Sequence, residues 1–344
     1  MRKTICICGG GALAHTSAGF IASHGHYDVR VLTRHPEQWN NNQLIIDDEL
    51  GNQFVARLSM VTSSSVDAIK GADIVLLCVP GFAINDILKT IAPHLEPSAC
   101  VGSIVSSTGF FFLAQDVLPQ STKLFGFQRV PFIARTKDYG RHAIIKGYKK
   151  QLFVATHNMS VESQKTLLTD VELMFNMPVV LLKNFYEASL TNSNPLLHTS
   201  RMYSMWKDWK EGITYDKCPQ FYTDWTIDAA SYYITMDREF QEILKVLPVT
   251  PGTIPNVLDY YESTNEESLT RKLRSINAFK GIMAPMTGNA VEGYVPDFKS
   301  RYFTEDFPFG LRWIVEVARR MNIKTPVIDK VYDWGIKTMK GSSY

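Results

Sequence analysis

The sequence predicts an α/β fold in which a doubly wound parallel sheet is followed by a mainly α-helical C-terminal domain. Three observations carry this prediction. Short apolar runs alternate with helical patterns along the first half, a glycine-rich turn follows the first run, and helical periodicity dominates beyond residue 184. Because 344 residues exceed one ordinary domain, we place two domains at residues 1–185 and 186–344.

The composition excludes several classes of function. The chain has 36 basic and 34 acidic residues, a formal net charge of +2, and therefore no electrostatic signature for nucleic acid or an anionic membrane surface. No apolar run approaches the roughly 20 residues of a membrane helix, and the first apolar stretch is too short for a signal peptide. We expect small-molecule substrates as partners and a monomer or homodimer.

The five cysteines favour a reducing, cytoplasmic setting, because their number is odd and three of them lie in apolar, strand-like runs. Cys6 and Cys8 have the C-x-C spacing of some metal sites. No second Cys or His pair lies nearby in the sequence, so we interpret both as small buried residues of one strand and expect no metal.

Each element of the first domain follows from its local pattern. Continuous apolar runs such as residues 74–79 are typical of parallel strands buried on both faces, whereas small and apolar residues after the glycine turn predict a helix. The predicted strands are residues 4–8, 27–33, 53–61 (a strand pair), 74–79, 100–105, 124–133 and 152–156, and the predicted helices are 12–24, 65–70 and 83–92.

The glycine turn at residues 9–14 (GGGALA) fits the pattern G-x-G-x-x-G/A between a strand and a helix, which predicts a dinucleotide-binding Rossmann domain. Gly9 permits the tight turn, Gly11 lets a pyrophosphate approach the backbone, and Ala14 lets the helix pack closely on the sheet. Ala12 and Leu13 open the helix, whose free N–H groups attract phosphate. A purely structural turn is the alternative.

The end of the second strand selects between the two nicotinamide cofactors. An acidic residue there binds the ribose of NAD, but this sequence has Thr33 and Arg34. Arg34 suits a 2′-phosphate, so we expect NADP, with NAD possible. A solvated Arg34, or one stacked on adenine, is the alternative.

Pro80 follows the apolar run at residues 74–79. Ligands of open parallel sheets lie beyond the carboxyl ends of the strands, so we expect this turn to flank the cofactor. An ordinary strand-ending turn would also explain it.

The second domain is predicted to be helical at residues 185–205, 223–247, 268–276, 310–321 and 326–339. Asn194 and Pro195 are expected to bend the first of these helices. Residues 247–255 and 281–297 are expected to be connections, and most of the aromatic side chains are expected to lie in the core.

A reduction needs a proton donor beside the hydride acceptor, and histidine suits this near neutral pH. Of the eight histidines, His198 lies just past the domain boundary, where it can face an interdomain cleft. Arg301 and Asp306 belong to a second polar cluster, in which an arginine can hold a carboxylate and an aspartate can orient a histidine. A buried core histidine and an ordinary helix start are the alternatives.

Three further segments make the chain resemble the octopine/nopaline (opine) dehydrogenase family: residues 192–198 (NSNPLLH), 236–239 (MDRE) and 301–311 (RYFTEDFPFGL). The resemblance covers both domains. It implies that His198 is the acid/base, Asp306 its partner, Arg301 a carboxylate anchor and Asn194 a substrate-binding residue. Thr199 and Ser200 replace a proline that is frequent in the family.

The resemblance implies reduction by NAD(P)H of the imine that forms from an α-keto acid and an amino acid. A keto reductase resembling ketopantoate reductase or glycerol-3-phosphate dehydrogenase, with Lys183 as the catalytic residue, is the first alternative. A non-catalytic sensor that binds a dinucleotide and a partner protein is the second.

Overall fold

A computed structural model of the protein describes residues 2–39 and 41–341. Residues 1, 40 and 342–344, which include the ends of the two predicted domains, lie outside the described part. The chain forms two compact units, Met1–Thr191 and Asn192–Tyr344. The division lies beyond the predicted boundary after residue 185, because helix α6 (Phe185–Ser189) packs against strands of the first unit.

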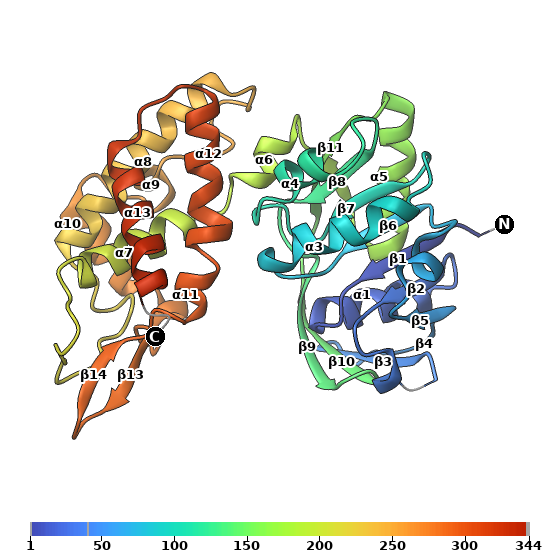
Figure 1. The fold of residues 1–344 in the computed structure, drawn as a ribbon, viewed down its shortest axis with the longest axis horizontal. Helices are drawn as coiled ribbons and strands as arrows, with labels where there is room; N and C mark the ends of the chain where they lie inside the picture. The colour runs from blue at the N-terminus through green and yellow to red at the C-terminus, as the bar shows by residue number, and fades with distance from the viewer. Residues whose placement is uncertain (1, 40, 342–344) are drawn as a thin grey trace. The chain divides into compact units, whose positions relative to one another are not determined.

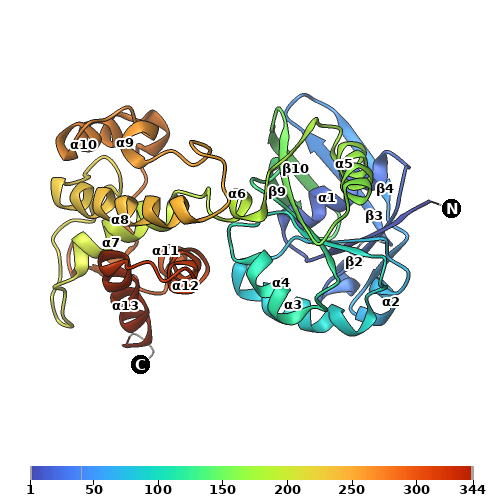
Figure 2. The same cartoon turned by 90° about the horizontal axis from the view of Figure 1, so that it is seen from above.

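The first unit is built on a doubly wound sheet, which confirms the predicted fold class (Figures 1 and 2). Strand β1 pairs in parallel with β2 and β6, and only the β8–β11 pair is antiparallel among the described strands of this sheet. The strands, in spatial order, are β12 (Val179–Leu181), β11 (Leu152–His157), β8 (Lys123–Phe127), β7 (Cys100–Ser103), β6 (Ile74–Leu77), β1 (Thr4–Cys8), β2 (Asp28–Leu32) and β5 (Met60–Thr62).

Helices cover both faces of this sheet, as its buried strands require. In β1, Ile5 and Ile7 pack with residues of α1 (Ala12–Ser23) and α5 (Val161–Phe175). Cys6 and Cys8 pack toward the other face, with residues of α2 (Ser65–Ile69), α3 (Gly81–Ile91) and α4 (Phe110–Val117). Both cysteines are fully buried, which confirms their interpretation as small core residues of one strand.

A second sheet, absent from the sequence prediction, lies on the outer side of α1. Its order is β4 (Gln53–Arg57), β3 (Gln43–Asp48), β10 (His142–Tyr148) and β9 (Phe132–Asp138). The single strand predicted at residues 124–133 was wrong: β8 and β9 are separate, because Pro131 lacks a backbone donor and restricts the residue before it. Consequently α1 is enclosed between two sheets.

The close approach of α1 to the second sheet depends on a glycine. A Cβ atom at Gly19 would lie 2.6 Å from Ile46 of β3. The same stretch of α1 is buried on every side, including its polar residues His15, Thr16 and Ser17. The helix is therefore enclosed over residues 14–21, directly after the glycine turn at its start.

The second unit is helical, with a short hairpin. Its elements are α7 (Asn194–Trp206), α8 (Ile227–Val246), α9 (Val257–Tyr260), α10 (Glu266–Ser275), β13 (Met286–Asn289), β14 (Gly293–Pro296), α11 (Arg301–Thr304), the π-helical turn η4 (Phe307–Leu311), α12 (Arg312–Arg320) and α13 (Pro326–Gly341). Helices α7 and α8 pack together, and α13 packs on both. None of the helices in the described part of the chain is long and apolar enough to cross a membrane.

Two predictions for the second unit were wrong. The helix expected at residues 185–205 is interrupted between α6 and α7, because Pro195 occupies the first turn of a new helix, where its missing N–H costs nothing. Residues 281–297 are not merely a connection, since they include the hairpin β13–β14.

The segment at residues 236–239 has a structural role, because two of its carboxylates bind the starts of other helices. The carboxylate of Asp237 accepts a hydrogen bond from the backbone N–H of Val257 at 2.9 Å. Glu239 accepts hydrogen bonds from the N–H groups of Val327 and Ile328, at 2.9 Å each. These carboxylates hold the starts of α9 and α13, where free N–H groups need acceptors.

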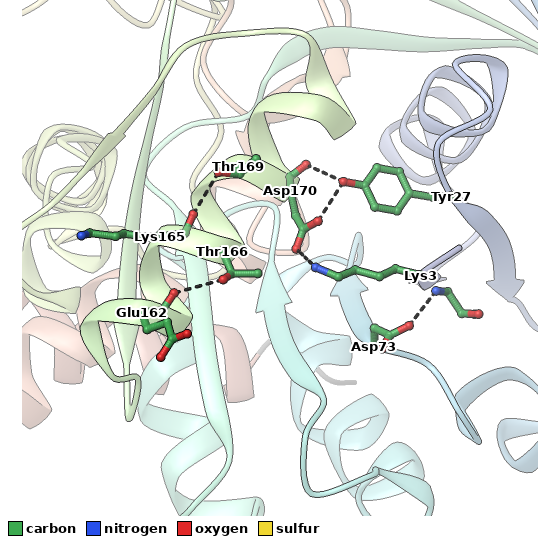
Figure 3. Close-up of polar contacts among 9 residues, drawn as sticks. Lys3, Tyr27, Asp73, Glu162, Lys165, Thr166, Thr169 and Asp170 are labelled. Carbon is green, nitrogen blue, oxygen red and sulfur yellow. Dashed lines mark hydrogen bonds and ion pairs between the residues drawn. The ribbon is translucent and has the colours of Figure 1, made fainter. Parts of the chain in front are cut away.

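An ion pair ties α5 to the start of the first strand (Figure 3). The carboxylate of Asp170 accepts hydrogen bonds from Lys3 Nζ at 2.6 Å and from the Tyr27 hydroxyl at 3.0 Å. Asp170 is 12% exposed and Lys3 40%, so solvent screens only part of the interaction. Burial and the nearby Asp170 raise the pKa of Tyr27, which keeps the phenol protonated as a donor.

Replacing this carboxylate should destabilise the first unit. We expect Asp170→Ala to lower the free energy of unfolding by about 2 kcal/mol, because Tyr27 loses its buried acceptor and Lys3 its counter-charge. Urea denaturation followed by circular dichroism measures the loss, and hydrogen exchange in β1 and α5 locates it. Lys165→Ala, an exposed substitution on the same helix, is the control; equal stability of the two variants would contradict the expectation.

Candidate active site

The glycine turn joins β1 to α1 at the switch point of the sheet, where β2 and β6 flank β1 and the connections diverge. Gly9 has φ +141°, which side chains rarely adopt, and a Cβ there would lie 2.5 Å from the carbonyl oxygen of Cys78. The turn after β1 and the turn after β6 are thus in direct contact. Pro80 is exposed and precedes α3.

The space above Gly11 is open, since a Cβ there would meet no atom within 4 Å. Gly11 is the N-cap of α1, and no side chain caps the helix or places a carboxylate in its first turn. Free N–H groups and the partial positive charge of a helix start attract phosphate. Ala14 is buried against the sheet, while Ala12 and Leu13 are half-buried. The residues present therefore fit the pyrophosphate of a dinucleotide.

Thr33 and Arg34 lie where β2 ends. Thr33 is buried and its backbone N–H bonds the carbonyl of Thr62, which fixes its place at the edge of the sheet. Arg34 is exposed, and its guanidinium has no partner among the residues that the structure describes. Its charge is thus available to a ligand.

His198 lies on α7 and is nearly buried. Its Nδ1 lies 2.7 Å from a carboxylate oxygen of Asp306, and its Nε2 lies 2.7 Å from the Tyr222 hydroxyl. Asp306 is an acceptor, so Nδ1 carries the proton and the lone pair of Nε2 accepts the Tyr222 O–H. The structure therefore brings together the predicted pair and presents Nε2 as the basic atom.

The two segments that carry this pair interlock. Gly310 lacks a side chain where Pro195 packs against it, and a Cβ there would lie 2.7 Å from the Pro195 ring. Asp306 precedes the π-helical turn η4, a distortion that is frequent at functional sites. Pro195 lies in the first turn of α7, one turn before His198, so its contact with Gly310 helps to set the register in which His198 meets Asp306.

Sequence reasoning missed Tyr222, Tyr302 and Arg201. Burial, followed by Tyr302, Tyr261 and Asp306, raises the pKa of Tyr222, so the phenol stays protonated and donates to His198. The Tyr302 ring contacts the imidazole, with 4.9 Å between ring centroids. Only the position of Tyr302 beside Arg301 could have signalled this.

Arg201 holds the segment that presents Tyr222. It is buried, and its guanidinium donates to the carbonyls of Phe221 and Asp224, at 3.2 and 2.7 Å, and to the Thr226 hydroxyl at 3.3 Å. Burial lowers the pKa of Arg201 to about 10, and Asp224 acts in the opposite direction. Because Arg201 lies one turn after His198 on α7, the same helix carries the imidazole and also holds the segment of Tyr222, whose phenol donates to that imidazole.

Three other predicted residues are exposed. Arg301 starts α11 beside Tyr302, and its charge opposes the burial that raises the pKa of Glu305. Asn194 lies one helical turn before His198. Lys183, the residue of the alternative mechanism, is exposed after β12. No group of three or more His, Cys, Asp or Glu residues in the described part of the chain is arranged to hold a metal ion.

A glycine turn on a doubly wound sheet, followed by a helical unit with a His–Asp pair, defines the class of NAD(P)-dependent dehydrogenases. Residues 181–339 match the family described as NAD/NADP octopine/nopaline dehydrogenase, alpha-helical domain. This part of the chain is thus similar to the helical domain of the octopine/nopaline dehydrogenases, and the predicted resemblance and enzyme class are confirmed. Residues 5–128 match the family described as ketopantoate reductase PanE/ApbA.

Relatives extend this similarity along the chain. The opine dehydrogenase of Haliotis discus hannai is 28% identical over 97% of this chain and 89% of its own length. The tauropine dehydrogenase of Arabella iricolor is 28% identical over 99% and 92%. A solved octopine dehydrogenase in complex with NADH and L-arginine superimposes with a TM-score of 0.86 at 25% identity, covering 98% of this chain and 90% of that one. These relatives are dehydrogenases, in agreement with the glycine turn of the first unit, which fits a dinucleotide.

The glycine turn makes two substitutions distinguishable. Gly9→Ala should destabilise the protein by more than about 2 kcal/mol, because its methyl meets the Cys78 carbonyl at a strained φ. Gly11→Ala should change stability by less than about 1 kcal/mol yet weaken dinucleotide binding at least about tenfold, because its methyl fills the open space. Thermal unfolding and calorimetric titration with NADH and NADPH measure both. Wild-type affinity in Gly11→Ala would refute the placement.

Proposed function

We propose that the protein reduces the imine formed from an α-keto acid and the amine of an amino acid, giving a secondary amine. Condensation releases water; the imine carbon then gains a hydride and its nitrogen a proton. When bound, the reduced nicotinamide supplies the hydride. The observation that carries the proposal is the 2.7 Å contact of His198 with Asp306, in a chain with a dinucleotide-binding turn.

His198 exchanges the proton in this reaction. Its Nε2 takes a proton from the ammonium group of the amino acid, so that the free amine can attack the keto carbon, and it returns a proton to the nitrogen when the imine is reduced. In this structure Nε2 instead accepts a hydrogen bond from the Tyr222 hydroxyl. Asp306 holds the Nδ1–H tautomer and stabilises the imidazolium that forms transiently. The carboxylate and the phenol thus fix the ring from both nitrogens.

Arg301 anchors the carboxylate of the keto acid. Its guanidinium is exposed and adjacent in sequence to Tyr302, whose ring contacts His198. A planar guanidinium binds a carboxylate through two parallel hydrogen bonds. Asn194, exposed on the turn of α7 that precedes His198, supplies a polar amide to the same substrate.

NADP is the preferred cofactor of the proposed enzyme. The residues that follow β2 are Thr33 and Arg34, without a carboxylate in the place where NAD-binding domains carry one. The unpartnered guanidinium of Arg34 suits a 2′-phosphate. Among related structures, octopine dehydrogenase is solved with NADH and yersinopine dehydrogenase with NADP+.

Replacing His198 should abolish chemistry while preserving cofactor binding. We expect His198→Ala to lower turnover by about 10²- to 10⁴-fold, the range for loss of an acid/base group, with an unchanged Kd for NADPH. Oxidation of NADPH is followed over pairs of keto acids and amino acids, with each keto acid also tested alone.

Lys183→Ala is the matched variant for this experiment and should retain full turnover. The reverse pattern, an inactive Lys183→Ala beside an active His198→Ala, would instead support a keto reductase of the ketopantoate type. Binding of dinucleotide without turnover on any substrate pair would support the sensor alternative.

Arg34 should decide the choice between cofactors. In Arg34→Ala we expect NADPH to bind at least about tenfold more weakly, because a charge-assisted hydrogen bond is worth roughly 1.5–3 kcal/mol, and NADH to bind as in the wild type. Calorimetric titration measures both constants. Arg57→Ala, an exposed arginine of β4, is the control. If Arg34→Ala weakened the binding of NADPH and NADH equally, Arg34 would not be the residue that binds the 2′-phosphate.

A further inference from the structure

The tip of the β9–β10 hairpin lies against the start of α1, although it is more than a hundred residues away in the sequence. At the tip, Gly140 has φ +71°, and a Cβ there would lie 2.2 Å from the carbonyl oxygen of Gln38. The residue before it, Tyr139, is half-buried. The hairpin tip therefore packs into the segment that follows Thr33 and Arg34, at the side of the glycine turn where a cofactor is selected.

His15 fixes this arrangement from inside α1. Its Nδ1 donates to the carbonyl of Gly11 at 2.9 Å, and its Nε2 accepts the backbone N–H of Gly140 at 2.8 Å. The ring stacks on Trp39, with 4.2 Å between centroids, and meets the edge of Tyr139 at 4.9 Å. Burial lowers the pKa of His15, so the neutral ring that both hydrogen bonds require is favoured. One buried imidazole thus joins the glycine turn to the hairpin tip.

Two hydroxyl groups converge on the middle glycine of the turn. A Cβ at Gly10 would lie 2.6 Å from the Tyr139 hydroxyl and 2.8 Å from the Thr33 hydroxyl. Neither hydroxyl has a hydrogen-bond partner among the residues described by the structure. Because a phenol and a threonine hydroxyl can each donate and accept a hydrogen bond, the pair can bind a polar ligand at the glycine turn.

We propose that Tyr139 is a cofactor-contacting residue, whose hydroxyl binds the adenosine half of the dinucleotide beside Thr33, and that His15 positions it. Thr33 ends β2, the strand whose end contacts the adenosine ribose in dinucleotide-binding domains. A phenol and a threonine hydroxyl can both donate to and accept from ribose hydroxyls. The inference rests on the proposed function in taking a dinucleotide as the ligand, and it adds a residue from outside the strand–turn–helix unit.

Tyr139→Phe tests the inference, because it removes one oxygen atom and keeps the ring that packs on His15. The full-length protein is titrated calorimetrically with NADH, NADPH and ADP-ribose. We expect each Kd to rise about fivefold, the effect of one neutral hydrogen bond, because all three ligands contain the adenosine half. Tyr148→Phe, on the same hairpin with its hydroxyl bonded to Asp48 at 3.0 Å, should bind all three as the wild type does.

The positioning part is tested by a double-mutant cycle. His15→Phe keeps an aromatic ring but loses both hydrogen bonds, and we expect the combined variant with Tyr139→Phe to lose less affinity than the sum of the single losses. Additive losses would overturn the role of His15. Wild-type affinity of Tyr139→Phe would overturn the inference as a whole, even if His15→Phe fails to fold. A wild-type protein that binds none of the three ligands would instead refute dinucleotide binding itself.

Discussion

The enclosure of α1 between two sheets is the constraint on which the nucleotide-binding unit depends. A surface helix needs one apolar face, but α1 is buried on all sides, which its small residues allow. Gly19 admits the side chain of Ile46 from the second sheet. A helix that cannot shift keeps its first N–H groups at fixed positions, and preorganised donors bind phosphate without a cost of reorganisation.

In the helical unit, the corresponding constraint acts on the imidazole of His198, which two hydrogen-bonding partners hold in one tautomer. Asp306 and Tyr222 reach His198 from segments far away in the sequence, so the ring is fixed by tertiary packing and not by its own helix. The contact of Pro195 with Gly310 helps to position Asp306 against His198, and Arg201 holds the segment that carries Tyr222. Burying the Arg201 guanidinium among carbonyl groups costs desolvation energy. In return, its hydrogen bonds hold the segment that carries Tyr222 in a fixed position.

Sequence patterns predicted the parts of the protein whose structure is decided locally. Gly9, Gly11 and Ala14 are recognisable because each meets a steric demand within one strand–turn–helix unit. The segment around His198 was recognised by resemblance, and the helix break before Pro195 was misjudged because helical periodicity continues across it. Tyr222 and Tyr139 could not be predicted, since nothing in their own sequence neighbourhoods indicates which distant residue they meet. The second sheet was missed for the same reason: β3 pairs with β10, a strand that lies far away in the sequence.

The two units also differ in how specifically each indicates the type of reaction. A glycine turn on a doubly wound sheet serves many reductions, and the first unit accordingly matches ketopantoate reductases in residues 5–128. Reaction type must therefore be argued from the residues that exchange the proton and hold the substrate. The residues proposed for these roles, His198, Asp306 and Arg301, lie in the second unit, within residues 181–339 that match the octopine/nopaline dehydrogenase family. Substitutions of Gly11, Arg34 or Tyr139 in the first unit should consequently change cofactor affinity whichever substrates are used, whereas substitutions around His198 should change turnover and substrate choice at constant cofactor affinity.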